Sequence, residues 1–202
     1  MRPLTFVLAC ATTAIIQFSP GAAAAAGREG APLAISSARV SLDGTSNIHA
    51  FTAATTNVRL TGLEVEDAPG ADLLTHILQP GNLKTLEIAI PAKTLTSPKD
   101  GIDKNMHKAL KTDVHPDITF RLRHIEAAGA AYRAVGWVSI AGVEREITLS
   151  LQIDRKDGVL AVAGTTDLLM TDFGITPPKA MLGMLKTNPK VQIRIDLLLS
   201  AL

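Results

Sequence analysis

GIDKNMHKALKTDVHPDITF, which spans Gly101–Phe120, decides the fold because it joins a short helix to a β-strand. In its first half, apolar residues recur at the spacing of one helical face, and polar residues occupy the opposite face. The apolar positions are Ile102, Met106, Ala109 and Leu110, and the polar ones are Asp103, Lys104, His107, Lys108 and Lys111. Asp100 is expected to cap the first amide groups of this helix. A lone helix with one apolar face needs an apolar surface to cover, which the rest of the chain must supply.

A proline separates this helix from the strand that follows it. His115-Pro116 ends the helix, because proline pushes the residue before it towards extended conformations. Beyond it Ile118, Phe120 and Leu122 alternate with polar residues, which is typical of a half-buried strand.

The same alternation recurs along most of the chain, with turn-sized gaps between the segments. It predicts further strands around Val40, over 48–65 as one long extended region, and at 86–90, 132–141, 147–153, 160–170 and 191–199. Asp157-Gly158 is a hairpin signal. Residues 73–78 fit either a brief helix or a strand, and Pro177-Pro178 favours the start of a second helical segment.

About eight strands with a period of two predict an antiparallel sheet that is dry on one face and wet on the other. Closure into a barrel would remove the exposed edges of such a sheet. The expected fold class is therefore all-β, an eight-stranded antiparallel barrel with one or two short helices. Its interior would be filled by side chains or would hold one small ligand.

The first 26 residues have the order of a secretory signal peptide. Arg2 precedes an apolar run over 4–18, and a tract of small residues follows it, with cleavage expected near Ala24 or Ala26. The apolar run is too short for a membrane span, so the mature protein is expected in the periplasm or outside the cell. Residues 27–37 are expected to form a flexible lead-in, and 38–202 a single domain.

Charge and cysteine content exclude several classes of protein. The chain has 20 Lys and Arg against 19 Asp and Glu, a balance that argues against nucleic-acid binding. The single cysteine, Cys10, lies in the expected signal peptide, so no disulfide is expected after export. No later apolar run is long enough to span a membrane, although transient membrane contact and a homodimer both stay open.

Four motifs together resemble the YceI-like family of exported, lipocalin-like proteins that are described as polyisoprenoid-binding. They are GTSNIHAF (44–51), IPAKTLTS with the helix stretch that follows it (90–120), GWVSIAGVEREITL (136–149) and MTDFGITPPKAMLGMLKT (170–187). The resemblance implies an eight-stranded antiparallel lipocalin-like barrel with helices at one end, and a long apolar channel that accepts an isoprenoid or another amphiphilic chain.

An apolar chain is bound by removing its surface from water, so the candidate ligand residues are apolar. They are Met106, Leu110, Phe120, Leu122, Val138, Ile140, Phe173, Met181 and Leu182. The alternative is that these side chains simply fill the core. Aromatic residues make up only 3% of the chain, which leaves few bulky groups to plug a barrel. Trp137 falls in the outward phase of its strand and is not a candidate.

A polar head group, such as a phosphate or a quinone, would need hydrogen-bond donors at the mouth of the barrel. The candidates are Asn47, His49, His107 and Lys108, with Lys104 and Lys179 as further possibilities. The alternative is that the lysines form a solvated helix face.

Neither a metal site nor a catalytic site is expected. The five histidines lack the short paired spacings of zinc sites, and no serine lies in a nucleophile elbow. No cofactor is implied. The leading interpretation is an exported lipid-binding barrel without catalytic residues. The alternatives are an enzyme that acts on an isoprenoid-type lipid, and a packed barrel that acts through its surface.

Overall fold

The computed structural model describes residues 33–67, 70, 72–180 and 184–202. The expected signal peptide and most of the expected lead-in therefore lie outside the described residues. So do Met181 and Leu182, two of the candidate ligand residues.

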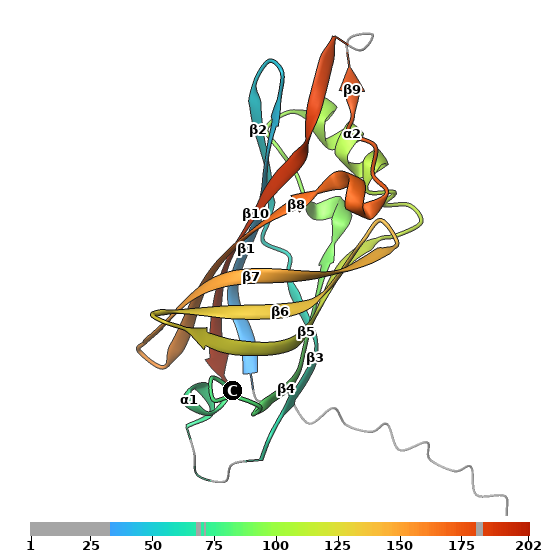
Figure 1. Cartoon of the computed structure of the whole chain (residues 1–202). Helices are drawn as coiled ribbons and strands as arrows, with labels where there is room; N and C mark the ends of the chain where they lie inside the picture. Colours follow the sequence, from blue (N-terminus) through green and yellow to red (C-terminus); the bar gives the residue numbers. More distant parts are fainter. Residues whose placement is uncertain (1–32, 68–69, 71, 181–183) are drawn as a thin grey trace, which may run out of the picture.

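The described chain folds into one curled antiparallel sheet (Figure 1). Its strands are β1 (Leu33–Ser46), β2 (Ala50–Thr55), β3 (Arg59–Val65), β4 (Leu83–Pro91), β5 (Asp117–Ala128), β6 (Ala131–Ile140), β7 (Val143–Lys156), β8 (Val159–Leu169), β9 (Lys179–Ala180) and β10 (Leu185–Ala201). Their order is β2-β1-β10-β8-β7-β6-β5-β4-β3, with β9 pairing only with β10. Most neighbouring strands are joined by hairpins, as expected for strands of period two.

One segment of chain provides both edges of this sheet. β2 and β3 stand at opposite ends of the strand order, yet only residues 56–58 separate them in the chain. An isolated bridge between Ala54 and Thr96 links β2 to the chain that leaves β4. The two strands together form the long extended region expected over 48–65, now broken in the middle. If β2 and β3 are counted as one broken strand and the short β9 is left out, the sheet has eight strands. This is the eight-stranded antiparallel lipocalin-like barrel that the sequence predicted, and the fold class is confirmed.

The first strand begins earlier than expected. Leu33 is buried and pairs with Ala201, so the lead-in predicted to extend to Ser37 is wrong over its last five residues. The register of β1 against β10 shifts between Ile35 and Ser37. This β-bulge interrupts the alternation of apolar and polar residues, and so hides the strand in the sequence.

The helices lie at both ends of the barrel (Figure 1). α2 (Asp100–Ala109) is the predicted amphipathic helix, and α1 (Leu73–His76) shows that residues 73–78 begin as a helix. Two short 3₁₀ helices, η1 (Ala92–Thr94) and η2 (Met170–Phe173), complete the fold. The expectation of helices at one end therefore holds for α2, whereas α1 covers the opposite end.

Two local predictions at the α2 end are wrong. Asp100 lies within the first turn of α2 and not at its cap, which is Lys99 and makes no side-chain capping bond. The carboxylate that helps to fix this turn is Asp103, which accepts a hydrogen bond of 2.8 Å from the Ser97 amide. Instead of starting a helix after Pro177-Pro178, residues Lys179–Ala180 form β9, because they pair with Leu185 and Lys186 in a hairpin.

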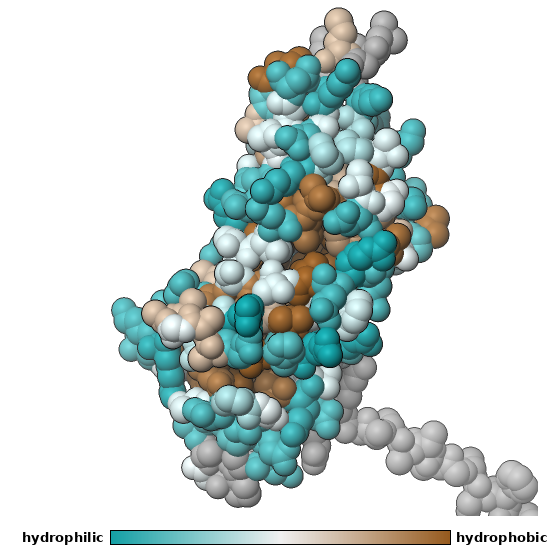
Figure 2. Space-filling model, viewed as in Figure 1, coloured by the Kyte–Doolittle hydropathy of each residue, from teal (hydrophilic) through white to brown (hydrophobic). Residues whose placement is uncertain are grey.

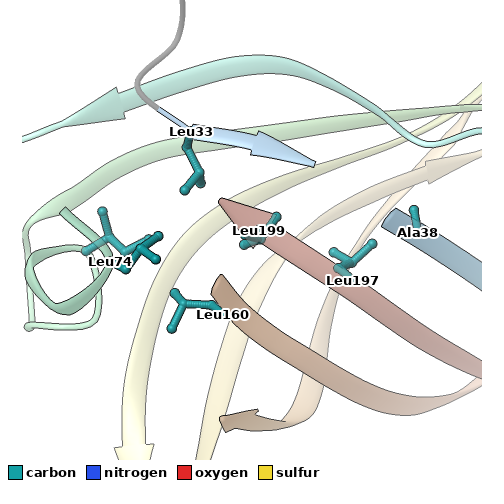
Figure 3. Close-up of a cluster of buried hydrophobic side chains, with 7 residues drawn as sticks. Leu33, Ala38, Leu74, Leu160, Leu197 and Leu199 are labelled. Carbon is teal, nitrogen blue, oxygen red and sulfur yellow. The ribbon is translucent and has the colours of Figure 1, made fainter. Parts of the chain in front are cut away.

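Buried leucines close the barrel at the α1 end (Figure 3). Leu74 of α1 meets Leu33, Leu160 and Leu199 from the ends of β1, β8 and β10. Arg155 holds α1 in place, since its guanidinium forms an ion pair with Asp72, the residue whose carboxylate caps the helix. This end of the barrel is therefore a packed plug.

We expect Leu160→Ala to lower the free energy of unfolding by about 2–4 kcal/mol, because truncating a packed leucine leaves a cavity. Leu160 is 1% exposed, whereas Leu198 on the outer face of β10 is 39% exposed. Leu198→Ala is the matched control and should cost less than about 1 kcal/mol in the same urea titration. Equal losses for the two variants would contradict the plug.

The ion pair of α1 predicts a pH dependence. The Thr75 hydroxyl, and after it Arg155, hold the pKa of the Asp72 carboxyl below its ordinary value. Such a group stabilises the fold above its unfolded pKa of about 3.9, and this contribution is lost as the pH falls through the lower folded pKa. Asp72→Asn should therefore lower the urea midpoint at about pH 7, and the difference from wild type should vanish near pH 2.

The control for this experiment is Asp154→Asn, which removes an exposed carboxyl from the same strand as Arg155. It should leave the urea midpoint unchanged at both pH values. If the urea midpoint of the wild type stayed above that of Asp72→Asn at low pH, the carboxylate charge would not be the cause of the difference.

Candidate ligand-binding site

A cavity of about 660 Å³ runs along the inside of the barrel. This volume falls within the range of about 300–1,000 Å³ that is typical of small-molecule sites. Nearly all of the side chains that line it are aliphatic, aromatic or Met. From outside, apolar atoms show between the polar side chains of the wall (Figure 2).

The alternation of each strand builds the wall of the cavity. On β7, Ile147, Leu149, Leu151 and Ile153 line the cavity, and the intervening Glu146, Thr148, Ser150 and Gln152 are exposed. Successive side chains of a strand point to opposite faces of the sheet, so a strict period of two produces an apolar lining. β8 and β10 add Val162, Ile193 and Ile195 to the same wall.

Glycines allow two aromatic side chains to lie flat against the wall. A Cβ atom placed on Gly136 would come within 2.6 Å of the Phe120 ring and 2.5 Å of the Arg121 carbonyl oxygen. Phe51 lies in the same way over Gly44, its cross-strand partner. The absence of a side chain at these two positions therefore fixes where the two rings lie.

The apolar face of α2 covers the end of the cavity opposite to α1. Ile102, Met106, Ala109 and Leu110 all line the cavity, as the helical spacing predicts. The Nε2–H of His107 donates a hydrogen bond of 2.8 Å to the Leu95 carbonyl, which ties the helix to the chain after η1.

Polar residues of the lining gather at this α2 end. Six of them come from the β1–β2 turn (Ser46 and His49), from α2 and its start (Lys99 and Asn105), and from the β9–β10 hairpin (Lys179 and Thr187). Thr119 of β5 and Thr166 of β8 are two further polar residues of the wall. No aspartate or glutamate in the described part of the chain lines the cavity. Because leucines plug the α1 end, the cavity has an apolar bottom and a cationic mouth.

Seven of the nine candidate ligand residues line the cavity: Met106, Leu110, Phe120, Leu122, Val138, Ile140 and Phe173. Trp137 is exposed on the outside of β6, in the phase that the alternation predicts. The structure thus brings the described candidates together from β5, β6, α2 and η2.

Of the four head-group candidates, only His49 lines the cavity. Asn47 instead bonds to the β9–β10 hairpin, His107 bonds to Leu95, and Lys108 lies on the exposed face of α2 with Lys104. Lys179 does line the cavity. Sequence reasoning missed Lys99 and Asn105. Asn105 lies three residues after Ile102 and four before Ala109, so helical spacing places it beside the predicted apolar face, and this spacing was the available signal.

The outer surface carries the carboxyl groups whose pKa is shifted. Lys84, Lys93 and Lys190 hold the pKa values of Glu66, Asp113 and Asp167 below their ordinary values, as Thr75 and Arg155 do for Asp72. These ion pairs are exposed to solvent, and none of their residues lines the cavity. Within the ranges that the structure describes, His, Cys, Asp and Glu residues nowhere form a group of three that suits a metal ion.

The fold and the cavity define the class of the protein, a single antiparallel barrel with an apolar interior. The family model of the YceI-like domain matches residues 36–199. The chain belongs to the YceI-like family.

Solved structures share this fold at low sequence identity. *Burkholderia cenocepacia* BcnA is 14% identical, with a TM-score of 0.63, and the match covers 80% of this chain and 95% of that one. A polyisoprenoid binding domain from *Saccharophagus degradans*, implicated in plant cell wall breakdown, is 11% identical with a TM-score of 0.62, covering 85% and 99%. The *Campylobacter jejuni* YceI protein is 14% identical with a TM-score of 0.51, covering 70% and 82%. The comparison with curated proteins gave no match.

The helices that the structure describes are all too short or too polar to cross a membrane.

We expect Gly136→Ala to destabilise the protein by about 1–3 kcal/mol, because the added methyl group must displace the Phe120 ring or the backbone of β5. Gly101→Ala is the matched control. Nothing lies within 4 Å of its added Cβ, and alanine is the better helix former, so it should stabilise α2 by up to about 1 kcal/mol. Urea unfolding of both variants measures the difference. A tolerated Gly136→Ala would show that Phe120 can lie elsewhere.

Proposed function

We propose that this protein is an exported carrier that holds an amphiphilic lipid, a polyisoprenoid or an isoprenoid quinone, inside its barrel. The observation that carries the proposal is the polarity of the cavity, which is apolar along most of its length and has its lysine and histidine side chains at the α2 end. A long hydrocarbon chain is bound by burial of its surface, at about 25 cal/mol per Å². The likeness to a polyisoprenoid binding domain supports this ligand class.

The orientation of the ligand follows from the two ends of the cavity. The hydrocarbon chain would extend towards the leucines below α1, and the polar head would stay at the mouth. There His49, Lys99, Asn105 and Lys179 are the side chains able to bind it. Met106, Leu110, Phe120, Leu122, Val138, Ile140 and Phe173 would contact the chain.

The proposal includes export and a role without turnover. The order of Arg2, the apolar run and the small residues up to Ala26 supports a cleaved signal peptide and a periplasmic or secreted protein. In this proposal the polar side chains of the described lining, His49 among them, bind the head group and take no part in turnover. Such a protein would transport or store its lipid, or protect it under stress.

Native mass spectrometry tests the proposal directly. The protein is purified from the exported fraction without detergent, and any bound molecule is extracted and identified. A stoichiometric isoprenoid lipid would establish the carrier and name its cargo. A protein without cargo that also takes up no added isoprenoid would overturn the proposal, and conversion of the added lipid would show an enzyme.

Charged groups placed in the cavity should abolish binding. We expect Leu110→Asp and Phe120→Asp to lower lipid retention at least a hundredfold, because an unpaired charge in an apolar site costs several kcal/mol. Lys104→Ala and Thr148→Asp, both on the outer surface, should retain lipid as the wild type does. Retention is measured by gel filtration with labelled polyprenol, and circular dichroism verifies the fold. Equal retention by folded Leu110→Asp and Phe120→Asp proteins would contradict the site.

A further inference from the structure

The segments at the mouth end of the barrel carry an excess of positive charge. Three described segments lie at the mouth: the β1–β2 turn (44–51), α2 with its flanks (99–111) and the two sides of the β9–β10 hairpin (178–180 and 184–190). Together they contain seven lysines, two aspartates and no glutamate. Since the whole chain is nearly neutral, the remainder of the barrel is acidic on balance. Of the seven lysines, Lys190 alone forms an ion pair with a carboxylate in the described part of the chain.

Two large apolar side chains are exposed at the same end. Ile48, in the β1–β2 turn, is 61% exposed, and Met184, in the β9–β10 hairpin, is 67% exposed. The two hairpins reach beyond α2 at the top of the molecule, where apolar atoms lie among polar ones (Figures 1 and 2). Neither side chain contributes to the plug or to the lining of the cavity.

Asn47 joins the two hairpins into one surface. Its side-chain Nδ2 donates to the Met184 carbonyl at 2.8 Å, and its Oδ1 accepts from the Lys186 amide at 2.8 Å. Its own amide donates to the Lys186 carbonyl at 3.1 Å. Three hydrogen bonds therefore hold Ile48 and Met184 on neighbouring loops, and this role explains why Asn47 does not face the cavity.

Two lysines face each other beside these apolar groups. Lys179 and Lys186 are directly opposite in the β9–β10 ladder. Like charges in this position repel one another. In the part of the chain that the structure describes, neither lysine forms an ion pair with a carboxylate, whereas Lys190 on the same strand is paired with Asp167. An external anion would relieve this repulsion.

We propose that this mouth end docks on a bilayer surface that contains anionic lipids. Ile48 and Met184 enter the interface between head groups and acyl chains, and Lys179 and Lys186 contact lipid phosphates. Apolar side chains flanked by lysines are the combination that binds an anionic membrane surface. The inference rests on the proposed function, since docking in this orientation points the α2 end of the cavity, where its lysines lie, at the source or destination of its cargo.

Vesicle co-sedimentation tests the docking without any cargo lipid. The purified protein is mixed with vesicles of phosphatidylcholine alone, or with a third of the lipid replaced by phosphatidylglycerol. We expect binding to the anionic vesicles only. Binding should weaken at high salt, because the ions screen the attraction between the lysines and the anionic lipids. Binding to both vesicle types alike, or to neither, would overturn the proposal.

Variants identify the surface that binds. The double variant Lys179→Gln/Lys186→Gln should lower partition onto anionic vesicles about 30-fold, at roughly 1 kcal/mol for each lysine near the surface. Ile48→Ser should lower it about tenfold. Lys156→Gln is the control, since it removes the same charge near the α1 end. A loss with Lys156→Gln as large as that with Ile48→Ser would place the membrane contact elsewhere and overturn the proposal.

Fluorescence reports the insertion itself. The chain has a single tryptophan, Trp137, on the outer wall of the barrel. In a Trp137→Phe background, Met184→Trp should shift its emission to shorter wavelength when anionic vesicles are added. An unshifted emission with vesicle-bound protein would overturn the insertion of this hairpin.

Lipid retention in detergent-free solution, measured without vesicles, separates the two proposals. If the protein retains lipid but does not bind anionic vesicles, only the docking proposal is overturned. If the protein binds anionic vesicles but retains no lipid, the carrier function is overturned, and with it the argument for the orientation of docking.

Discussion

The barrel depends on the break at residues 56–58, which lets one segment of chain pair with both edges of the sheet. A curled sheet exposes two edges with unpaired amides and carbonyls, and closure requires both to find partners. Here one segment serves both edges, because β2 pairs with β1 and β3 pairs with β4. Ala54 and Thr96 exchange backbone hydrogen bonds of 2.9 and 3.1 Å across the seam, and the Thr55 and Thr94 hydroxyls bond at 2.7 Å. Closure is what separates an inner face from an outer one, and therefore what creates a cavity.

The two ends of the barrel differ because different kinds of side chain meet there. At the α1 end, leucines from β1, β8 and β10 pack against Leu74, and no polar residue of the described lining lies among them. At the α2 end, the strands continue beyond the barrel into hairpins with short polar side chains and lysines. This asymmetry gives the cavity a direction, which a barrel that was packed or open at both ends would lack.

The sequence predicted what depends on local periodicity. The alternation of Ile147, Leu149, Leu151 and Ile153 specified the lining of β7, and the helical spacing of Ile102 and Met106 specified the face of α2. The sequence was uninformative wherever a long-range partner decides the structure. The bulge after Ile35 hid the start of β1, and β9 exists only because it pairs with β10. The mouth is the clearest case, since Lys99, which no sequence pattern singled out, is brought to one cavity with His49 and Lys179 by the topology of the chain.

The burial of α2 couples the helix to whatever occupies the barrel. No residue from Asp100 to Ala109 is fully buried. The apolar face of the helix borders the cavity, and it also packs through Met106 and Ala109 against the buried cluster around Leu95. A bound hydrocarbon chain would supply the contacts that side chains supply to an ordinary core helix. By thermodynamic linkage, ligand and helix would then stabilise one another by the same free energy. The cover over the mouth would be tightest when the protein carries its cargo and easiest to displace once the cargo has left.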